Sequence, residues 1–232
     1  MISDKKSPPT TTGYVMDYIR DGIYDGRYPL GSRLDQKAIA EELGVSIVPI
    51  REAVRLLEGD RLIDLYPRRG AFVTNLSTDE LDELYLIREE LEELSTQRSI
   101  PNLTAERLAD LAEIIQQMEK ATSEDDFALL LEFNRAFHFT IYEASNMPLL
   151  VEMIAGLWNR SALYRRMFTY LPERAVQALQ EHKQIYDACR RRDGNEAGDA
   201  VRLNIRLTVE ALLDELERTE DHAIHELVER QQ

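Results

Sequence analysis

The stretch GVSIVPIREAV, residues 44–54, marks where one helix ends and the next begins. Gly44 follows a short segment of helical periodicity, and glycine suits the left-handed residue that closes a helix. Ser46 is of a residue type that caps helix starts, and Pro49 is tolerated only in the first turn of a helix. The sequence therefore predicts two helices separated by a tight turn, the second beginning directly after Ser46.

The segments on either side complete a small domain. A first helix is predicted around Ile19 and Ile23, and a second runs from about Asp35 to Gly44. The third helix ends near Gly59. The segments RLIDLY and AFVTN then have the character of strands, and PRRG joins them. A helix, a helix–turn–helix and a basic-tipped hairpin together describe a winged helix-turn-helix, which we assign to residues 12–76.

The order of basic residues in this domain indicates a nucleic-acid surface. A recognition helix enters the major groove with its N-terminal residues foremost, and flanking elements contact phosphates or the minor groove. The alternative is that these arginines are ordinary solvated residues of a small domain. We take as candidate DNA contacts Lys37, Ser46, Ile47, Val48, Pro49, Arg51, Arg55, Arg68, Arg69 and Gly70.

Charge divides the 232 residues into two unlike parts. The chain carries 28 Lys and Arg against 43 Asp and Glu, a formal net charge of −15. Residues 1–76 hold 11 basic and 11 acidic residues, so residues 77–232 hold 17 basic and 32 acidic ones. A neutral part can approach a phosphate backbone, whereas a strongly acidic part is repelled. We therefore expect two domains with different roles.

Several classes of protein are disfavoured. No apolar run approaches the ~18–20 residues of a membrane span, and MISDKKSPPTTTG lacks the apolar core of a secretory signal. The single cysteine, Cys189, excludes an internal disulfide and fits a reducing compartment. We expect a cytoplasmic protein with no membrane partner and a short disordered lead-in over residues 1–11.

Residues 77–218 have helical patterns throughout. Ser77 with Glu80 forms a capping box ahead of the first helix. No strand pattern intrudes, so the chain is predicted to be mainly α, with an antiparallel all-α bundle of about six helices at its C-terminal end. Residues 219–232 are expected to form a charged, frayed tail. Further helix starts are predicted at Thr104, Ser123, Pro148, Pro172 and Asn195.

Few residues of this part suggest chemistry. Asn134 and His138 lie four apart and share a helix face, while His182 and Asn204 fall on two later helices. Such histidines are also common as satisfied structural residues, and that alternative stays open. No Ser/His/Asp order, phosphate-cradling glycine loop or CxxC is present, so nothing favours an enzyme.

Four ordered blocks of the first part resemble a known DNA-binding domain. PLGSRL, AIAEELGVS, PIREAVRLLEGDRLI and RRGAFV are similar to the GntR family of bacterial regulators. The family usually has an arginine after Gly-Val-Ser, followed by Thr and Pro, whereas this chain has Ile47 and Val48. The change removes a side chain suited to reading guanine and leaves two that suit thymine methyl groups.

The helical part resembles the FCD effector domain of the FadR-like branch of that family, through IREELEE, FNRAFHFTIYEASNMPLL and EHKQIYDAC. In that domain an Asp or Asn four residues before a His, and two later His, commonly hold a divalent metal. The resemblance implies that Asn134, His138 and His182 could bind Zn, Ni or Mn, with Asn204 in the place of the last His. The same four groups could bind an organic acid directly.

Arg88 matches the family arginine that faces this cavity, and a guanidinium suits bidentate binding of a carboxylate. A surface pair between Arg88 and Glu92, four residues on, is the alternative. Arg165 and Arg166 are weaker candidates for the same role.

Three hypotheses result. The resemblance implies a homodimeric transcription factor that binds a palindromic operator in double-stranded DNA and responds to a small carboxylate effector bound in the helical part. A second possibility is a DNA-binding dimer whose helical half is a scaffold that senses nothing. The third is a metal-dependent hydrolase using His138 and His182, which would lack a carboxylate ligand and a general base.

Overall fold

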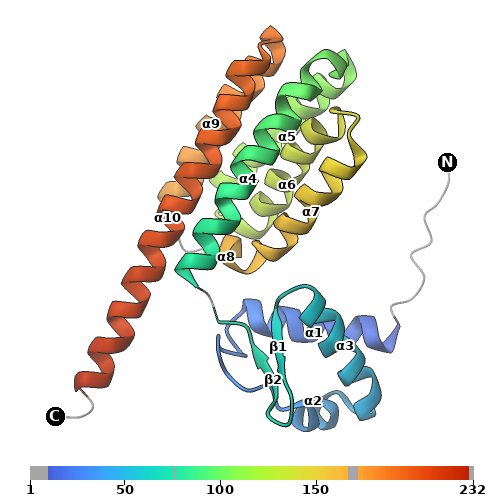
Figure 1. Ribbon diagram of the computed structural model, residues 1–232, viewed down its shortest axis with the longest axis vertical. Helices are drawn as coiled ribbons and strands as arrows, with labels where there is room; N and C mark the ends of the chain where they lie inside the picture. Colours follow the sequence, from blue (N-terminus) through green and yellow to red (C-terminus); the bar gives the residue numbers. More distant parts are fainter. Residues whose placement is uncertain (1–9, 76, 167–171, 230–232) are drawn as a thin grey trace. The chain divides into compact units, whose positions relative to one another are not determined.

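The computed structural model describes residues 10–75, 77–166 and 172–229, without the side chains of 163, 166, 172 and 219–229. The chain divides into two compact units between residues 76 and 77, shown in blue and in green to red in Figure 1. We describe each unit by itself. The lead-in expected over residues 1–11 lies outside the described residues as far as position 9.

The N-terminal unit combines three helices with an antiparallel hairpin. Thr10 accepts a hydrogen bond from the N–H of Gly13. Asp35 accepts from the N–H groups of Lys37 and Ala38. Both caps satisfy N–H groups that have no partner within their own helix. The elements are α1 (Thr11–Tyr24), α2 (Gln36–Leu43), α3 (Ile47–Gly59), β1 (Ile63–Tyr66) and β2 (Gly70–Val73).

The turn between α2 and α3 depends on Gly44, whose φ of 64° is left-handed. Arg33 adds an antiparallel bridge to Phe72 of the hairpin. The predicted winged helix-turn-helix is therefore confirmed. Its core lies where α1 packs on α3, and completely buries Val15, Ile19, Ile50, Ala53 and Leu57.

The start of α3 differs from the prediction in one respect. Ser46 is the N-cap residue, but its side chain makes no cap hydrogen bond. A cap oxygen normally accepts from the N–H of the second or third helical residue. Pro49 is the third helical residue and has no N–H. The helix thus begins where the sequence predicts, although the predicted hydrogen bond to Ser46 is wrong.

The C-terminal unit is a bundle of helices, and the mainly α fold is confirmed. α4 packs along α10 and also contacts α6 and α7, while α5 packs against α6 and α9. α4 is therefore central, and several of its buried residues are polar. The elements are α4 (Thr78–Ser99), the 3₁₀ helix η1 (Ile100–Asn102), α5 (Ala105–Ser123), α6 (Phe127–Glu143), α7 (Pro148–Arg160), α8 (Ala162–Arg166), α9 (Pro172–Arg191) and α10 (Gly194–Glu229).

Two predicted caps of this unit are confirmed. Ser77 accepts from the N–H of Glu80 at 3.3 Å, and Thr104 accepts from the N–H of Arg107 at 3.1 Å. The other half of the predicted capping box is not formed. The N–H of Ser77 donates to the hydroxyl of Tyr164 at 3.2 Å, and the carboxylate of Glu80 forms an ion pair with Arg160 at 3.3 Å. Each cap satisfies an N–H group of the first helical turn.

Two other predicted caps are wrong. Ser123 is still the last residue of α5, and Asp126 caps α6. α10 begins before Asn195, because Asp193 accepts from the N–H three residues on. In both places an aspartate close to the helix start supplies a charged acceptor for the unpaired N–H groups.

The last helix is longer than predicted. α10 continues to Glu229, whereas the sequence analysis ended it near Arg218 and expected a frayed tail from residue 219. The sequence has no proline or glycine after Gly198, so it contains no residue that would stop the helix. Residues 230–232 of the expected tail lie outside the described residues.

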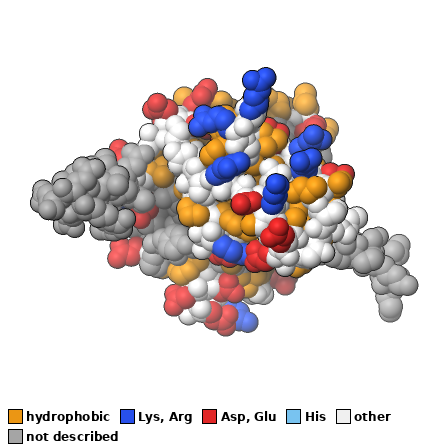
Figure 2. All heavy atoms as spheres, turned by 90° about the horizontal axis from the view of Figure 1, so that it is seen from below, with side chains coloured by type: hydrophobic (Ala, Val, Ile, Leu, Met, Phe, Trp, Pro, Cys, Tyr) orange, Lys and Arg blue, Asp and Glu red, His pale blue; other side chains and the backbone are white. Residues whose placement is uncertain are grey.

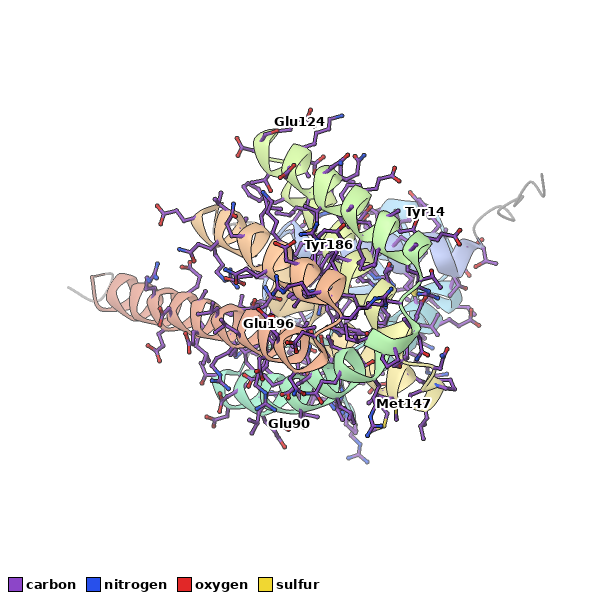
Figure 3. The ribbon with its side chains drawn as sticks, turned by 90° about the horizontal axis from the view of Figure 1, so that it is seen from above. Tyr14, Glu90, Glu124, Met147, Tyr186 and Glu196 are labelled. Carbon is purple, nitrogen blue, oxygen red and sulfur yellow. The ribbon has the colours of Figure 1, made fainter. Side chains whose placement is uncertain are left out.

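The acidic excess lies on the outside of the bundle. Figure 3 shows Glu124 and Glu90 at opposite edges of the view, and the side chains of Glu90, Glu124 and Glu196 are all exposed. The chain has no described helix that is both long enough and apolar enough to span a membrane.

Candidate functional site

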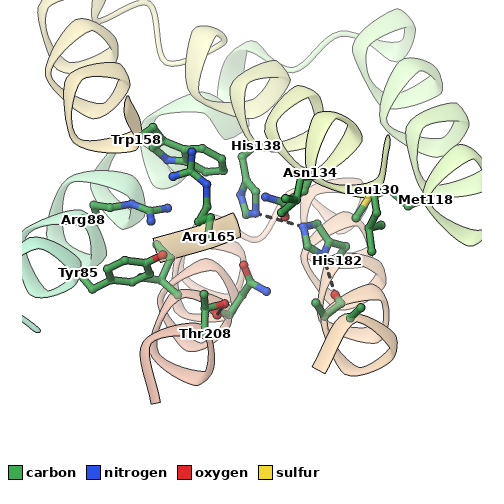
Figure 4. A pocket seen from close by; sticks show the side chains of 15 residues that line it. Tyr85, Arg88, Met118, Leu130, Asn134, His138, Trp158, Arg165, His182 and Thr208 are labelled. Atoms are coloured by element: carbon green, nitrogen blue, oxygen red, sulfur yellow. Dashed lines mark hydrogen bonds between the residues drawn. The ribbon is translucent and has the colours of Figure 1, made fainter. Parts of the chain in front are cut away.

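A cavity of about 50 Å³ lies inside the helical unit, enough for about three or four water-sized groups. It brings together all five effector-site candidates of the sequence analysis, from four different helices (Figure 4). The first and last of these candidates in the sequence, Arg88 and Asn204, are 116 positions apart, and the fold places all five around one space. The polar lining consists of Tyr85, Arg88, Asn134, His138, Trp158, Arg165, His182, Asn204 and Thr208.

His138 and His182 face each other across this cavity. Their Nε2 atoms are 3.2 Å apart, and both side chains are buried. Burial, followed by the charges of His182, Arg88 and Arg165, holds the pKa of His138 well below 6.5. Burial lowers the pKa of His182 to about 4. Both imidazoles are therefore neutral at pH 7, and each has one nitrogen lone pair.

Glu92 is the buried centre of a hydrogen-bond network. The Nε of Arg88 donates to its Oε1 at 2.7 Å, and the Nε1 of Trp158 donates to the same oxygen at 2.9 Å. The Tyr142 hydroxyl lies 2.5 Å from Oε2 and 3.0 Å from Nδ1 of His138. The pair of Arg88 and Glu92 thus exists, but the alternative that it is a surface pair is wrong, because both side chains are buried.

The guanidinium groups of Arg88 and Arg165 both lie close to the ring of Trp158. The Cζ atoms of Arg88 and Arg165 lie 4.6 and 4.4 Å from its ring centroid. Arg165 also donates to the hydroxyl of Ser161. Burial, and then the charge of Arg88, lower the pKa of Arg165 to about 10. Among the charges that act on this guanidinium, Arg88 lowers its pKa more than Glu92 raises it.

Tyr85 is a cavity residue that sequence reasoning missed. It is 1% exposed, and within the described residues its hydroxyl has no hydrogen-bond partner. Its ring lies 4.5 Å from the Cζ of Arg88. Its place three residues before Arg88, on the same helix face, is a signal that could have identified it. Arg166, one of the weaker candidates, is the last residue of α8, and its side chain lies outside the described part.

Asn204 is held by residues behind the cavity. Its Nδ2 donates to Oε2 of Glu181 at 2.6 Å. Arg174 in turn donates to both carboxylate oxygens of Glu181, at 2.9 and 2.8 Å. Because the amide nitrogen is engaged by Glu181, the amide oxygen is the atom available to the cavity. Asn134 lines the cavity from α6, one turn before His138.

The donors of this cavity fit a divalent cation. Two nitrogens 3.2 Å apart can both lie about 2.1 Å from one ion. No cluster of three or more His, Cys, Asp or Glu that could hold a metal occurs in the described part of the chain. A cation here would therefore rely on two imidazoles and the amide oxygens of Asn134 and Asn204, and a further anion would have to offset its charge.

The candidate DNA contacts surround the start of α3 in the N-terminal unit. Figure 2 shows lysine and arginine side chains standing out between apolar and uncharged ones on the face that it views. Arg33, from the loop before α2, was missed by the sequence analysis, although it lies in the quoted block PLGSRL. A hollow on this unit is lined by residues that include Arg33, Lys37, Ile47, Arg51 and Gly70.

The hairpin tip has an unusual backbone. Arg68 and Gly70 have φ values of 64° and 106°, both in the left-handed region. The Cζ of Arg69 lies 5.6 Å from the ring of Tyr66, so this guanidinium rests on the hairpin. Among the candidate contacts, the exposed side chains are those of Lys37, Ser46, Val48, Arg51, Arg55, Arg68 and Arg69.

Comparisons with known proteins agree with this division of the chain. Residues 11–73 match the model described as bacterial regulatory proteins, gntR family, and residues 83–207 match the FCD domain. The transcriptional regulator McbR of Escherichia coli is 38% identical over 130 residues, which cover 56% of this chain and 59% of that protein. The galactonate operon transcriptional repressor of Escherichia coli is 30% identical over 201 residues, 77% of this chain and 86% of that protein.

A solved structure extends the similarity over most of the chain. The structure of Escherichia coli McbR/YncC has a TM-score of 0.73 and 28% identity, and the match covers 89% of this chain and 99% of that one. These relatives are regulators of transcription and not enzymes. The hydrolase hypothesis is therefore set aside. With an FCD match over more than half of its length and a GntR match ahead of it, the chain belongs to the GntR family and is a DNA-binding transcriptional regulator with an FCD domain.

Proposed function

We propose that a small carboxylate binds in the cavity of the helical unit and controls the binding of DNA by the N-terminal unit. The observation that carries this proposal is an excess of positive charge at the cavity wall, from the buried Arg88 and the half-buried Arg165. Arg88 and Arg165 both line the cavity, and Glu92 is the only carboxylate that either contacts in the described residues. A buried charge is costly unless it is paired, so an anionic ligand stabilises this wall.

The unpaired hydroxyl of Tyr85 supports the same proposal. A buried hydroxyl without a partner costs free energy, and a ligand oxygen can accept its hydrogen. A carboxylate bound to Arg88 and Arg165 would present such an oxygen (Figure 4). The volume of about 50 Å³ favours a compact acid. The galactonate repressor is a relative named for an operon of a carboxylic acid.

A divalent cation at His138 and His182 is compatible with the carboxylate. Two imidazoles and two amides supply no negative charge, and a bound acid would provide it. When bound, the cation would act as a Lewis acid that holds the acid's oxygens. The residues of the chain would orient the ligand: His138 and His182 from one side, Arg88 and Arg165 from the other.

For the N-terminal unit, we propose that two copies bind a palindromic operator through the start of α3 and the hairpin. Arg51 and Arg55 would enter the major groove, while Lys37, Arg68 and Arg69 would contact phosphates or the minor groove. Ile47 and Val48 would approach thymine methyl groups. Arg33 extends the same cationic hollow and adds a further phosphate contact.

The test measures thermal stability and operator affinity of the full chain with a panel of small mono- and dicarboxylates. An effector raises the melting temperature, because it binds only the folded protein, and it changes operator affinity. Tyr85→Phe should weaken effector binding by about 10- to 100-fold, since a hydrogen bond to a charged group contributes about 1.5–3 kcal/mol.

The same substitution should leave the stability of the free protein unchanged, because the hydroxyl has no partner to lose. Tyr186→Phe, on α9 and outside the cavity lining, is the matched control. If no acid of the panel raises the melting temperature or changes operator affinity, the alternative of a scaffold that senses nothing is favoured instead.

A further inference from the structure

The hydroxyl of Tyr142 has one proton and two neighbours that compete for it. Glu92 Oε2 lies 2.5 Å away, and Nδ1 of His138 lies 3.0 Å away. Glu92 also accepts hydrogen bonds from the guanidinium of Arg88 and the indole of Trp158, which can only donate. The shorter contact, to the oxygen of a carboxylate that accepts from a guanidinium, places the hydroxyl proton toward Glu92.

This assignment determines the tautomer of His138. Since the hydroxyl of Tyr142 donates to Glu92, only its oxygen lone pair remains for His138. We therefore assign the hydrogen of His138 to Nδ1, which donates to Tyr142, and not to Nε2, whose other neighbour is the amide of Asn204. A neutral imidazole has one N–H, so Nε2 of His138 is bare.

An independent contact determines the tautomer of His182. Its Nδ1 lies 2.5 Å from the carbonyl oxygen of Ala178. A carbonyl can only accept, so Nδ1 of His182 carries the hydrogen and its Nε2 is bare as well. The two bare Nε2 atoms lie 3.2 Å apart, with no hydrogen between them. Two facing lone pairs repel each other, and a cation placed between them would be attracted to both.

We propose that Tyr142, held in place by Glu92, is a positioning residue that fixes His138 with a bare Nε2 and thereby makes the histidine pair able to bind a divalent cation. The proposal rests on the proposed function only because the pair lines the proposed effector cavity. Neither Tyr142 nor Glu92 touches the cation; both act through His138. The same carboxylate accepts from Arg88, so Glu92 connects the histidine pair, the proposed cation site, with the arginine of the proposed carboxylate site.

Loss of the hydroxyl of Tyr142 has a specific structural consequence. In Tyr142→Phe the Nδ1–H of His138 loses its acceptor at a site that is fully buried. The other tautomer, with the hydrogen on Nε2, can instead donate to Nε2 of His182 across 3.2 Å, a normal distance for a hydrogen bond. In the wild type both Nε2 lone pairs are free to bind a cation. In the variant they are joined by a hydrogen bond between the two histidines.

The first measurement is the tautomeric state of each imidazole by ¹⁵N NMR of the full chain, freed of metal with a chelator. In the wild type we expect the hydrogen on Nδ1 in both His138 and His182. In Tyr142→Phe we expect His138 to carry it on Nε2, whereas Tyr186→Phe, outside the cavity lining, should retain the wild-type tautomers. A merely structural role of Tyr142 would not move the hydrogen from one nitrogen to the other.

The second measurement is calorimetric titration with Zn²⁺ alone, without an organic acid. Tyr142→Phe should bind Zn²⁺ about 10- to 100-fold more weakly than the wild type, the usual effect of removing a group that orients a metal-binding histidine. Tyr186→Phe should bind it with wild-type affinity, because Tyr186 lies outside the cavity lining.

A wild-type His138 with its hydrogen on Nε2 would overturn the proposal without any variant, so the test does not depend on the folding of Tyr142→Phe. Equal Zn²⁺ affinities of wild type and Tyr142→Phe, or no Zn²⁺ binding by the wild type, would overturn it too. Because both measurements use neither acid nor DNA, a failure to find an effector is distinguishable from a failure of this proposal.

Discussion

The two units of this chain place their candidate functional residues in opposite environments. In the N-terminal unit the basic candidates Lys37, Arg51 and Arg55 are exposed on the surface. In the helical unit Arg88, His138 and His182 are almost completely buried. An exposed cation can contact a large polyanion at low cost, whereas a buried polar group must be satisfied by its neighbours or by a ligand.

This difference explains what each surface can recognise. DNA is larger than the unit that binds it, and its phosphates can be met only by side chains that project from the surface. A small acid can be surrounded, so its recognition groups can be inside. Burial then shifts the pKa values of those groups, as it does for His182 and Arg165. Removing a side chain should therefore affect mainly binding in the first unit, and stability in the second.

The largest effect is expected for Arg51→Ala. A good base or phosphate contact at the start of a recognition helix contributes about 1–3 kcal/mol per half-site, and two half-sites make the loss about 2–6 kcal/mol. Operator affinity in a gel-shift assay at fixed salt should fall by a factor of at least about 30, with no change in thermal stability, because the side chain is exposed.

Arg20→Ala is the control for charge alone. Arg20 lies on α1 and pairs with Asp17 at 2.8 Å, outside the proposed DNA surface. Its removal should change operator affinity much less. An affinity of Arg51→Ala within twofold of the wild type would contradict the assigned surface and remove the contrast between the two units.

The next largest difference between the two units is expected in how their free energy of unfolding depends on pH. The pKa of His182 is about 4 in the folded protein and about 6.5 when unfolded. Between these values the unfolded chain binds a proton that the folded chain does not, so the free energy of unfolding falls as the pH is lowered from 6.5 to 4. The loss from His182 is about 3 kcal/mol, and His138 adds to it in the same direction.

Trp158 makes this effect measurable for one unit alone. It is the only tryptophan of the chain and is buried in α7. Urea unfolding followed by its fluorescence, with a chelator present, should show the fall in stability for the wild type and a smaller fall for His182→Gln. The N-terminal unit contains no histidine. An identical pH dependence in His182→Gln would mean that His182 is already charged in the folded protein.

The sequence predicted more of the first unit than of the second. Local patterns define the winged helix-turn-helix, since Gly44 closes one helix and Pro49 opens the next within six residues. The prediction that His138 and His182 line one cavity came from the family resemblance, because helical spacing alone does not say which helix faces pack together. Tyr85 and Glu92 were missed as site residues because their roles depend on contacts between helices, with Arg88, Tyr142 and Trp158.

The smallest effects concern two helix caps that look alike in sequence. Thr104 accepts from the N–H of Arg107, whereas Ser46 makes no cap hydrogen bond, because Pro49 has no N–H at the third helical position. Thr104→Ala should destabilise the helical unit by about 1 kcal/mol in urea unfolding followed by Trp158 fluorescence. Ser46→Ala should change the stability of the N-terminal unit, measured by circular dichroism, by less than about 0.5 kcal/mol.

For operator affinity, Ser46→Ala should have the larger effect and Thr104→Ala the smaller one. The exposed hydroxyl of Ser46 lies at the proposed DNA surface and makes no cap hydrogen bond, so it can donate to a phosphate. Its loss should weaken operator binding by about 1 kcal/mol per half-site, while Thr104→Ala should leave it unchanged. If Ser46→Ala instead lowers stability as much as Thr104→Ala and leaves operator affinity intact, Ser46 is an ordinary structural cap, and the start of α3 has no exposed hydroxyl that serves DNA.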